Sequence, residues 1–141
     1  MFLSVGVPVG LYFQFHGGLE ILAIALLCLR FLPFIASKPK SNILELGTGI
    51  SFSLAWMANG LDAHSKLTGT DNHPHLTEIA NRFFGQDNRV DLVCADGAQR
   101  LKNYTGSKFD LIFAEHGRAN TASSMKPWRL LKLGEFTLLM I

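Results

Sequence analysis

Two glycines and two aspartates near the middle of the chain have the types and the spacing of a nucleoside-binding pocket. Gly47 and Gly49 come just after the apolar residues Ile43, Leu44 and Leu46, so the chain can turn sharply there and bring its backbone close to a ligand. Asp71 and Asp96 each end a later apolar run, where a carboxylate can accept hydrogen bonds from a bound nucleoside. The pattern predicts a pocket that holds a nucleoside at its ribose and its base.

The glycine turn does not complete the fingerprint of dinucleotide-binding proteins. That fingerprint, G-x-G-x-x-G, needs a third glycine, but Phe52 stands at the last position. A nicotinamide-dependent oxidoreductase would share the glycine turn and Asp71. It stays the second alternative, because both Phe52 and the strand end at 96–98 disfavour it.

An alternation of strands and helices that begins near residue 37 must position these groups. Expected strands cover 42–46, 66–71, 90–95, 109–114 and 135–141, and expected helices cover 51–61, 74–84, 97–103 and 121–132. Such alternation predicts the α/β class, with a Rossmann-like, doubly wound parallel sheet and helices on both faces. Ligands of such sheets bind outside the carboxyl ends of the strands, where Gly47, Asp71, Asp96 and Glu115 should converge.

The composition changes near residue 37, so we expect an apolar N-terminal segment, 1–36, and a globular domain, 37–141. The segment has only Glu20 and Arg30 as formal charges. A helix packed against the sheet is the preferred interpretation. Membrane association through residues 17–36 is the alternative, since about 20 apolar residues span a bilayer. A targeting segment is disfavoured because no basic stretch precedes the apolar run, and we expect a cytoplasmic protein.

The charge, the cysteines and the histidines of the chain bear on three questions: a nucleic-acid partner, a disulfide and a metal site. The chain has 13 basic and 11 acidic residues and a formal net charge of +2, so nucleic acid is not an expected partner. Cys28 and Cys94 lie far apart in apolar segments and predict buried free thiols rather than a disulfide. His73 and His75 lack a third ligand, so we expect no metal site and two solvent-facing rings.

The chain resembles the class I S-adenosylmethionine-dependent methyltransferases, in particular their small-molecule O-methyltransferase-like branch. The resemblance covers about residues 38–141. It rests on Glu45-Leu46-Gly47-Thr48-Gly49, Thr70-Asp71, Ala95-Asp96-Gly97-Ala98 and Phe109-Asp110-Leu111-Ile112-Phe113-Ala114-Glu115. It implies S-adenosylmethionine as the cofactor and a small molecule as the methyl acceptor.

The resemblance also implies a role for each matching residue. In that family, residues that match Glu45 and the glycine turn line the methionine end of the cofactor. The residue that matches Asp71 binds the ribose hydroxyls, and those that match Asp96 and Gly97 lie at the adenine edge. The implied cofactor-binding residues are Glu45, Gly47, Thr48, Gly49, Asp71, Asn72, Asp96 and Gly97.

Glu115 and His116 follow the fourth strand and are the candidate catalytic residues. At this place the resembled O-methyltransferases often carry an aspartate that binds a divalent metal or faces the substrate. A glutamate stands here instead, so a metal is not expected. His116 could act as a general base, with a plain loop histidine as the alternative.

The terminal strand, 135–141, has no expected successor. In the resembled family further strands form a hairpin with the sheet edge, and we expect those C-terminal hairpin strands to be missing, as in a domain truncated after its fifth strand. An apolar edge of this kind predicts self-association. The missing region helps to shape the acceptor side in the resembled family, so its absence predicts weak or absent turnover. The alternative to an active methyltransferase is therefore a cofactor-binding fragment with little or no catalysis, with or without membrane association through residues 17–36.

Overall fold

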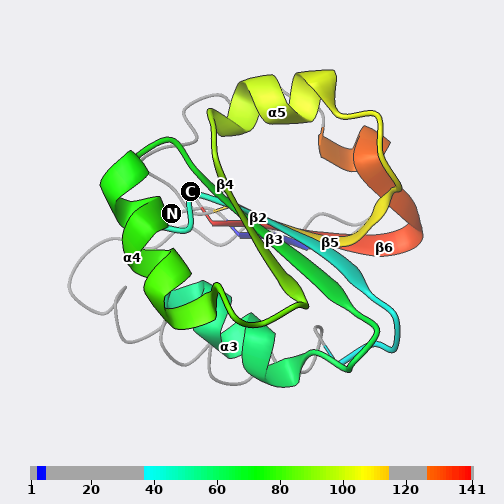
Figure 1. Ribbon diagram of the computed structural model, residues 1–141. Helices are drawn as coiled ribbons and strands as arrows, with labels where there is room; N and C mark the ends of the chain where they lie inside the picture. The colour runs from blue at the N-terminus through cyan, green and yellow to red at the C-terminus, as the bar shows by residue number, and fades with distance from the viewer. Residues whose placement is uncertain (1–2, 6–36, 115–126, 141) are drawn as a thin grey trace.

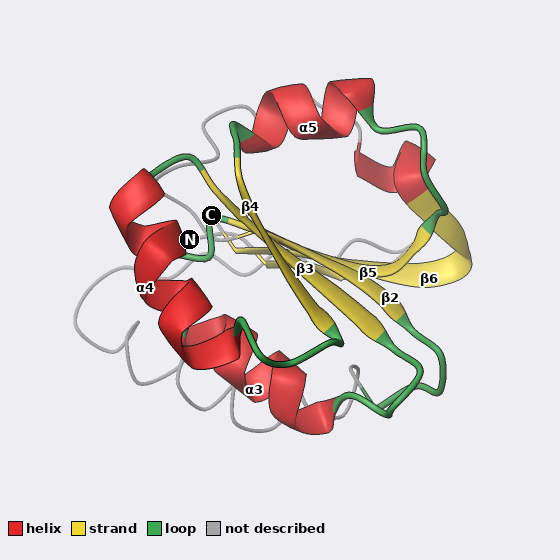
Figure 2. Cartoon of the chain, viewed as in Figure 1, coloured by secondary structure: helices red, strands yellow, loops and turns green. Residues whose placement is uncertain are grey.

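A mixed six-stranded sheet forms the centre of the computed structural model, which describes residues 3–5, 37–114 and 127–140. The strands are β1 (Leu3–Val5), β2 (Asn42–Leu46), β3 (Lys66–Asp71), β4 (Val90–Cys94), β5 (Phe109–Ala114) and β6 (Leu131–Met140). The helices are α3 (Phe52–Gly60), α4 (Pro74–Phe84), α5 (Gly97–Asn103) and the 3-10 helix η1 (Pro127–Leu130). Helices lie on both faces of the sheet (Figures 1 and 2).

The strand order β1-β6-β5-β2-β3-β4 places β2 inside the sheet, parallel to β3 on one side and to β5 on the other. Along the chain, the order runs outward from β2 to β4 and then returns to β5 on the other side of β2. The carboxyl end of β2 is therefore a topological switch point, the place where doubly wound sheets bind ligands. The prediction of a Rossmann-like sheet covered on both faces is confirmed.

Successive side chains of the central strands enter two different apolar cores. Ile43 packs with Leu54 of α3 on one face, whereas Leu44 packs with Leu101 of α5 on the other. Figure 1 shows α3 and α4 on one side of the sheet and α5 on the opposite side. Every residue of Phe109–Ala114 is buried, as expected for a parallel strand that is covered on both faces.

Local chemistry explains where two of the helices begin. Pro74 lies in the first turn of α4, where its fixed φ suits the helix and its missing N–H would have had no partner. Asp96 precedes α5 and accepts a hydrogen bond from the Gln99 amide at 2.9 Å. The bounds that the sequence predicts for α4, α5, β2, β3 and β5 agree with the structure.

The approach to the last strand differs from the prediction. The sequence predicts a helix over 121–132, of which residues up to 126 lie outside the described part of the chain. Pro127–Leu130 form only a 3-10 turn, and Leu131 already begins β6, where it pairs with Phe109. Strand pairing has replaced the last turn of the expected helix, and a proline at 127 favours this because it cannot donate a helical hydrogen bond.

The far edge of β6 carries a strand that the sequence did not predict. Leu3–Val5 form β1 and pair antiparallel with residues 138–140. The expectation that the terminal strand is the edge of the sheet is therefore wrong, since β1 lies beyond β6 in the strand order. Residues 6–36, with the expected helix and the alternative membrane segment, lie outside the described residues. Of the helices that are described, none has both the length and the apolar character that a bilayer crossing requires.

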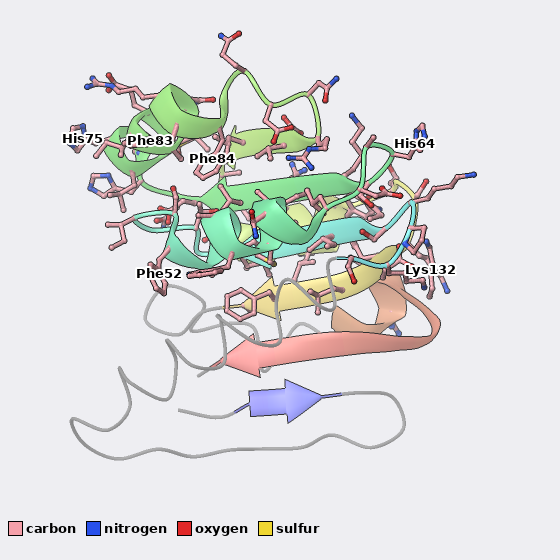
Figure 3. The ribbon with its side chains drawn as sticks, turned by 90° about the horizontal axis from the view of Figure 1, so that it is seen from below. Phe52, His64, His75, Phe83, Phe84 and Lys132 are labelled. Atoms are coloured by element: carbon pink, nitrogen blue, oxygen red, sulfur yellow. The ribbon has the colours of Figure 1, made fainter. Side chains whose placement is uncertain are left out.

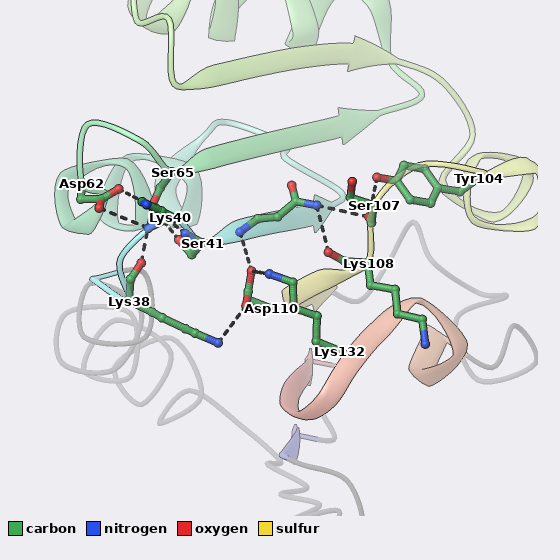
Figure 4. A network of polar contacts seen from close by, with 11 residues as sticks. Lys38, Lys40, Ser41, Asp62, Ser65, Tyr104, Ser107, Lys108, Asp110 and Lys132 are labelled. Carbon is green, nitrogen blue, oxygen red and sulfur yellow. Dashed lines mark hydrogen bonds and ion pairs between the residues drawn. The ribbon is translucent and has the colours of Figure 1, made fainter.

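A buried carboxylate joins three strands at their amino ends (Figure 4). Asp110, in β5, is 4% exposed and accepts hydrogen bonds from Lys38 at 2.8 Å and from Lys132 of β6 at 2.6 Å. The backbone N–H of Asn42, at the start of β2, donates to the same carboxylate at 2.7 Å. This network lies at the end of the strands opposite the predicted pocket, so we assign it a role in stability.

Candidate functional site

The loop between β2 and α3 has a left-handed backbone at three residues. The φ angles are 83° at Gly47, 53° at Gly49 and 68° at Ser51. Glycine adopts this region without a steric penalty because it has no Cβ. A Cβ at Gly49 would approach the Gly47 carbonyl oxygen only to 3.9 Å, so backbone conformation rather than lack of space favours glycine there. The expectation of a glycine-dependent turn is confirmed.

The backbone amides of this loop point toward the end of β3. The amides of Gly47 and Thr48 both donate to the Thr70 carbonyl oxygen, at 2.8 and 3.3 Å. The Gly49 amide donates to Oδ2 of Asp71 at 2.8 Å. Three successive N–H groups are thus engaged by the protein itself, and the loop does not offer them to a ligand.

Asp71 holds two backbone segments at once. Its side chain is nearly buried, its Oδ2 accepts from Gly49, and its Oδ1 accepts from the His73 amide at 2.8 Å. Each oxygen of a carboxylate can accept more than one hydrogen bond, so this arrangement is compatible with further donors such as ribose hydroxyls. The role of Asp71 in ligand binding stays a prediction, whereas its contact with Gly49 could not be deduced from the sequence spacing.

Two further residues of the site were missed by the sequence reasoning. Ser53 of α3 donates a hydrogen bond to Glu45, which is completely buried, so Ser53 fixes this carboxyl group relative to the helix. Gly69 of β3 makes room for Thr48, because a Cβ at position 69 would lie 2.8 Å from the Thr48 hydroxyl oxygen. The only sequence signal for this close approach is a glycine inside an expected strand.

The second strand-end carboxylate lies at the start of α5. Asp96 caps the helix, and Gly97 lies close to β2, since a Cβ there would be 3.3 Å from Leu46 Cδ2. Asn72 is exposed. An open groove of about 460 Å³ begins at Asp96 and is lined by Ala95, Asp96, Gln99, Arg100, Asn103, Tyr104, Thr105 and Gly106. Asp96 is therefore accessible from solvent along the outer side of α5.

Apolar side chains stand exposed beside the glycine turn. Ile50 is 80% exposed and Phe52 is 49% exposed. The Phe52 ring makes an edge contact with Trp56, with ring centroids 6.5 Å apart, and Figure 3 shows Phe52 at one end of α3. The loop thus combines a polar anchor on β3 with an apolar outer surface.

The remaining sequence predictions have different outcomes. Glu115 and His116 lie outside the described residues. His73 and His75 are exposed, as expected. The prediction of a buried thiol is wrong for Cys94, which is a free but exposed cysteine because β4 is an edge strand. Within the described ranges, no group of three or more potential ligand side chains could hold a metal ion.

Comparisons with known proteins agree with this fold. A curated relative, the catechol O-methyltransferase of Mycobacterium tuberculosis, is 26% identical over 98 residues, which cover 67% of this chain and 44% of the relative. The O-methyltransferase of Bacillus cereus, solved in complex with SAH, superimposes with a TM-score of 0.65 at 23% identity and covers 86% of this chain and 62% of that chain. The SAH-bound methyltransferase of Podospora anserina gives a TM-score of 0.63 at 26% identity, with 77% of this chain and 50% of that chain covered.

The chain spans less than two thirds of the length of each of these relatives. The family model described as O-methyltransferase matches residues 28–139, which is most of the chain and includes the glycine turn, both strand-end aspartates and β6 up to its next-to-last residue. This match shows that the chain belongs to the O-methyltransferase family.

Proposed function

We propose that this chain binds S-adenosylmethionine and serves in methyl transfer to a small-molecule acceptor. The observation that carries the proposal is the engagement of the loop amides by β3, which ends in the hydrogen bond from Gly49 to Asp71 at 2.8 Å. Family membership and the SAH found in two of the related structures support the same cofactor.

The engaged amides separate this cofactor from a nicotinamide dinucleotide. Loops that bind pyrophosphate present free backbone N–H groups to the anion. Here the N–H groups of residues 47–49 already donate to β3. Two buried acidic side chains also lie beside the loop: Glu45 precedes it in the chain, and Asp71 accepts a hydrogen bond from it. Both would disfavour a phosphate. The same surroundings suit a ligand with positive charge and ribose hydroxyls. S-adenosylmethionine has both, through its ammonium and sulfonium groups and its nucleoside.

Binding and orientation are the main tasks that this proposal gives to the described residues. S-adenosylmethionine supplies an activated methyl group on a sulfonium sulfur, so alignment with the acceptor contributes most of the rate enhancement, up to roughly 7 to 11 kcal/mol. Asp71 would accept hydrogen bonds from the ribose hydroxyls, and Asp96 would lie at the adenine edge. His116, with Glu115 beside it, would take the proton of an acceptor hydroxyl as general base.

A small-molecule acceptor, a cytoplasmic location and, as an alternative, membrane association through residues 17–36 belong to the same proposal. Self-association through β6 also stays a proposal. Only residues 138–140 of β6 pair with β1, so the outer edge of the strand before them has no partner strand among the described residues.

Parallel calorimetric titrations of the full chain with S-adenosylhomocysteine and NAD test the proposal. We expect binding of the first ligand only. Asp71→Ala should weaken it by about 1 to 3 kcal/mol because charge-assisted hydrogen bonds are lost. Asp91→Ala is the matched control, since Asp91 is an exposed carboxylate on the edge strand β4. Binding of NAD alone, or equal affinity in Asp71→Ala and the parent chain, would contradict the assignment.

Turnover needs a separate measurement. Transfer of a labelled methyl group from S-adenosylmethionine to a catechol or other small acceptor would support an active enzyme. Cofactor binding without transfer to any acceptor would favour the alternative of a binding fragment with little catalysis.

A further inference from the structure

The glycine loop, residues 47–51, has an energetically unfavourable backbone conformation. Gly47, Gly49 and Ser51 all adopt left-handed backbone conformations within five residues. Glycine loses more backbone freedom on ordering than any other residue, and serine in this region is strained. A loop of this kind keeps one geometry only where the surrounding structure fixes it at several points.

The hydrogen bonds that hold the glycine loop in place are accepted by two consecutive residues of β3. Thr70 holds the amides of Gly47 and Thr48 through its backbone carbonyl, and these contacts extend the pairing of the strands. The Gly49 amide is different, since its acceptor is a side chain, the carboxylate of Asp71 at 2.8 Å. The third contact therefore depends on the identity of residue 71, while the first two do not.

The surroundings of Asp71 favour such a role. The side chain is 4% exposed, and its second oxygen accepts from the His73 amide at 2.8 Å, so the carboxylate is held from both sides. Hydrogen bonds from an amide to a charged acceptor are stronger than neutral ones, and burial strengthens them further. The carboxylate that would receive the ribose hydroxyls is thus the group that fixes the glycine loop.

We propose that Asp71 is a positioning residue for the glycine loop in addition to its role toward the ribose. Through its hydrogen bond to Gly49, it prearranges the loop that receives the amino-acid end of the cofactor, so one carboxylate couples the two halves of the ligand site. This inference rests on the proposed function, because it assigns the two ligand halves from S-adenosylmethionine. Prearrangement raises affinity by lowering the entropy that binding must remove.

Two ligands that differ only in the amino-acid end test this coupling by calorimetry on the full chain. S-adenosylhomocysteine contains the whole nucleoside and the homocysteine portion, and adenosine contains the nucleoside alone. If Asp71 only binds ribose, Asp71→Ala weakens both ligands by the same factor. If it also positions the loop, the loss for S-adenosylhomocysteine is larger by roughly tenfold or more, the value of a charge-assisted hydrogen bond. Asp96→Ala is the matched control. It should change both affinities by one common factor, because Asp96 caps α5 and its side chain makes no hydrogen bond to the loop among the described residues.

Amide hydrogen exchange supplies a readout that needs no ligand. In the parent chain the Gly49 amide should exchange slowly. In Asp71→Ala it should exchange much faster, while the Gly47 amide, whose acceptor is the Thr70 carbonyl, stays protected as an internal control. The measurement on the parent chain tests whether the Gly49 amide is hydrogen-bonded in solution, and it does not require that the variant folds.

The outcomes separate the two proposals. Equal losses for the two ligands in Asp71→Ala, or an unprotected Gly49 amide in the parent chain, would overturn the positioning role. A parent chain that binds neither S-adenosylhomocysteine nor adenosine would contradict the proposed function instead, and the exchange rate of Gly49 would still report whether Asp71 holds the loop.

Discussion

Removal of the Asp110 carboxylate is the sharpest test of how this sheet is stabilised. Asp110→Ala leaves the partly buried backbone amide of Asn42 without its acceptor at 2.7 Å, a loss of about 1 to 3 kcal/mol. The side chains of Lys38 and Lys132 are 45% and 44% exposed, so solvent screens their ion pairs and each adds at most about 1 kcal/mol. We therefore expect the free energy of unfolding to fall by about 1 to 5 kcal/mol in all. Asp110→Asn keeps one acceptor oxygen, and its loss should be about half as large.

The pH dependence of stability should change together with this network. Burial alone raises the pKa of Asp110, but hydrogen bonds from Lys132, Lys38 and the Asn42 amide, with the charge of Lys132, outweigh it and hold the pKa below its usual value. A carboxyl group whose pKa is lower in the folded chain than in the unfolded chain stabilises the fold above the unfolded pKa of about 3.9. That contribution is lost as the pH falls below this value and through the folded pKa. The stability advantage of the parent over Asp110→Asn should therefore be full near neutral pH and shrink in acid.

Urea unfolding followed by circular dichroism, repeated between neutral pH and about pH 3, measures both effects. Glu78→Gln is the control, because Glu78 pairs with Arg82 on the exposed side of α4 and should leave the free energy of unfolding nearly unchanged. Equal stability of Asp110→Ala and Glu78→Gln would refute the assigned cost of the Asn42 amide. A difference between parent and Asp110→Asn that stays constant into acid would refute the argument from the lowered pKa.

Three substitutions around the glycine loop follow from the same geometry. Gly69→Ala should lower the free energy of unfolding by about 1 to 3 kcal/mol, because its Cβ would lie 2.8 Å from the Thr48 hydroxyl; an unchanged urea midpoint would contradict this. Ser51→Gly should raise the free energy of unfolding by about 1 kcal/mol, since it relieves a φ of 68° and removes a buried hydroxyl that has no hydrogen-bond partner among the described residues; a lower midpoint would show that the serine side chain stabilises the loop. Gly49→Val should abolish binding of S-adenosylhomocysteine and leave the helical circular dichroism largely intact, because valine does not tolerate a φ of 53°; normal binding would place the pocket elsewhere.

Local patterns predicted the elements around the switch point well. The strand Asn42–Leu46 and the helix Pro74–Phe84 both have the bounds that the sequence indicates. The apolar residues Ile43, Leu44 and Leu46 mark the strand and a proline at the helix start marks the helix, so each signal lies within the element itself. The order of Gly47, Asp71 and Asp96 along the chain then predicted a site at the carboxyl ends of the strands.

Contacts between distant segments were not predictable in this way. No local signal tells that Leu3–Val5 pair with the last strand, or that Leu131 joins β5 instead of ending a helix. Exposure of Cys94 depends on β4 being the edge of the sheet, which is a property of strand order. The same holds for the loop, where the glycine spacing predicted a turn but not the partner of the Gly49 amide.

Asp71 and Asp110 show why burial and residue type alone do not distinguish the carboxylate that we propose to bind ligand from one that stabilises the sheet. Both are 4% exposed, and both lie on strands beside β2. Asp110 lies at the amino ends of the strands and accepts from Lys38 and Lys132, whose ammonium groups compensate its charge. Asp71 lies at the carboxyl end of β3 and accepts from backbone amides, which fix its position but carry no net charge. Asp110 therefore serves the stability of the sheet, whereas backbone amides orient Asp71 at the edge where we propose that a cationic nucleoside ligand binds.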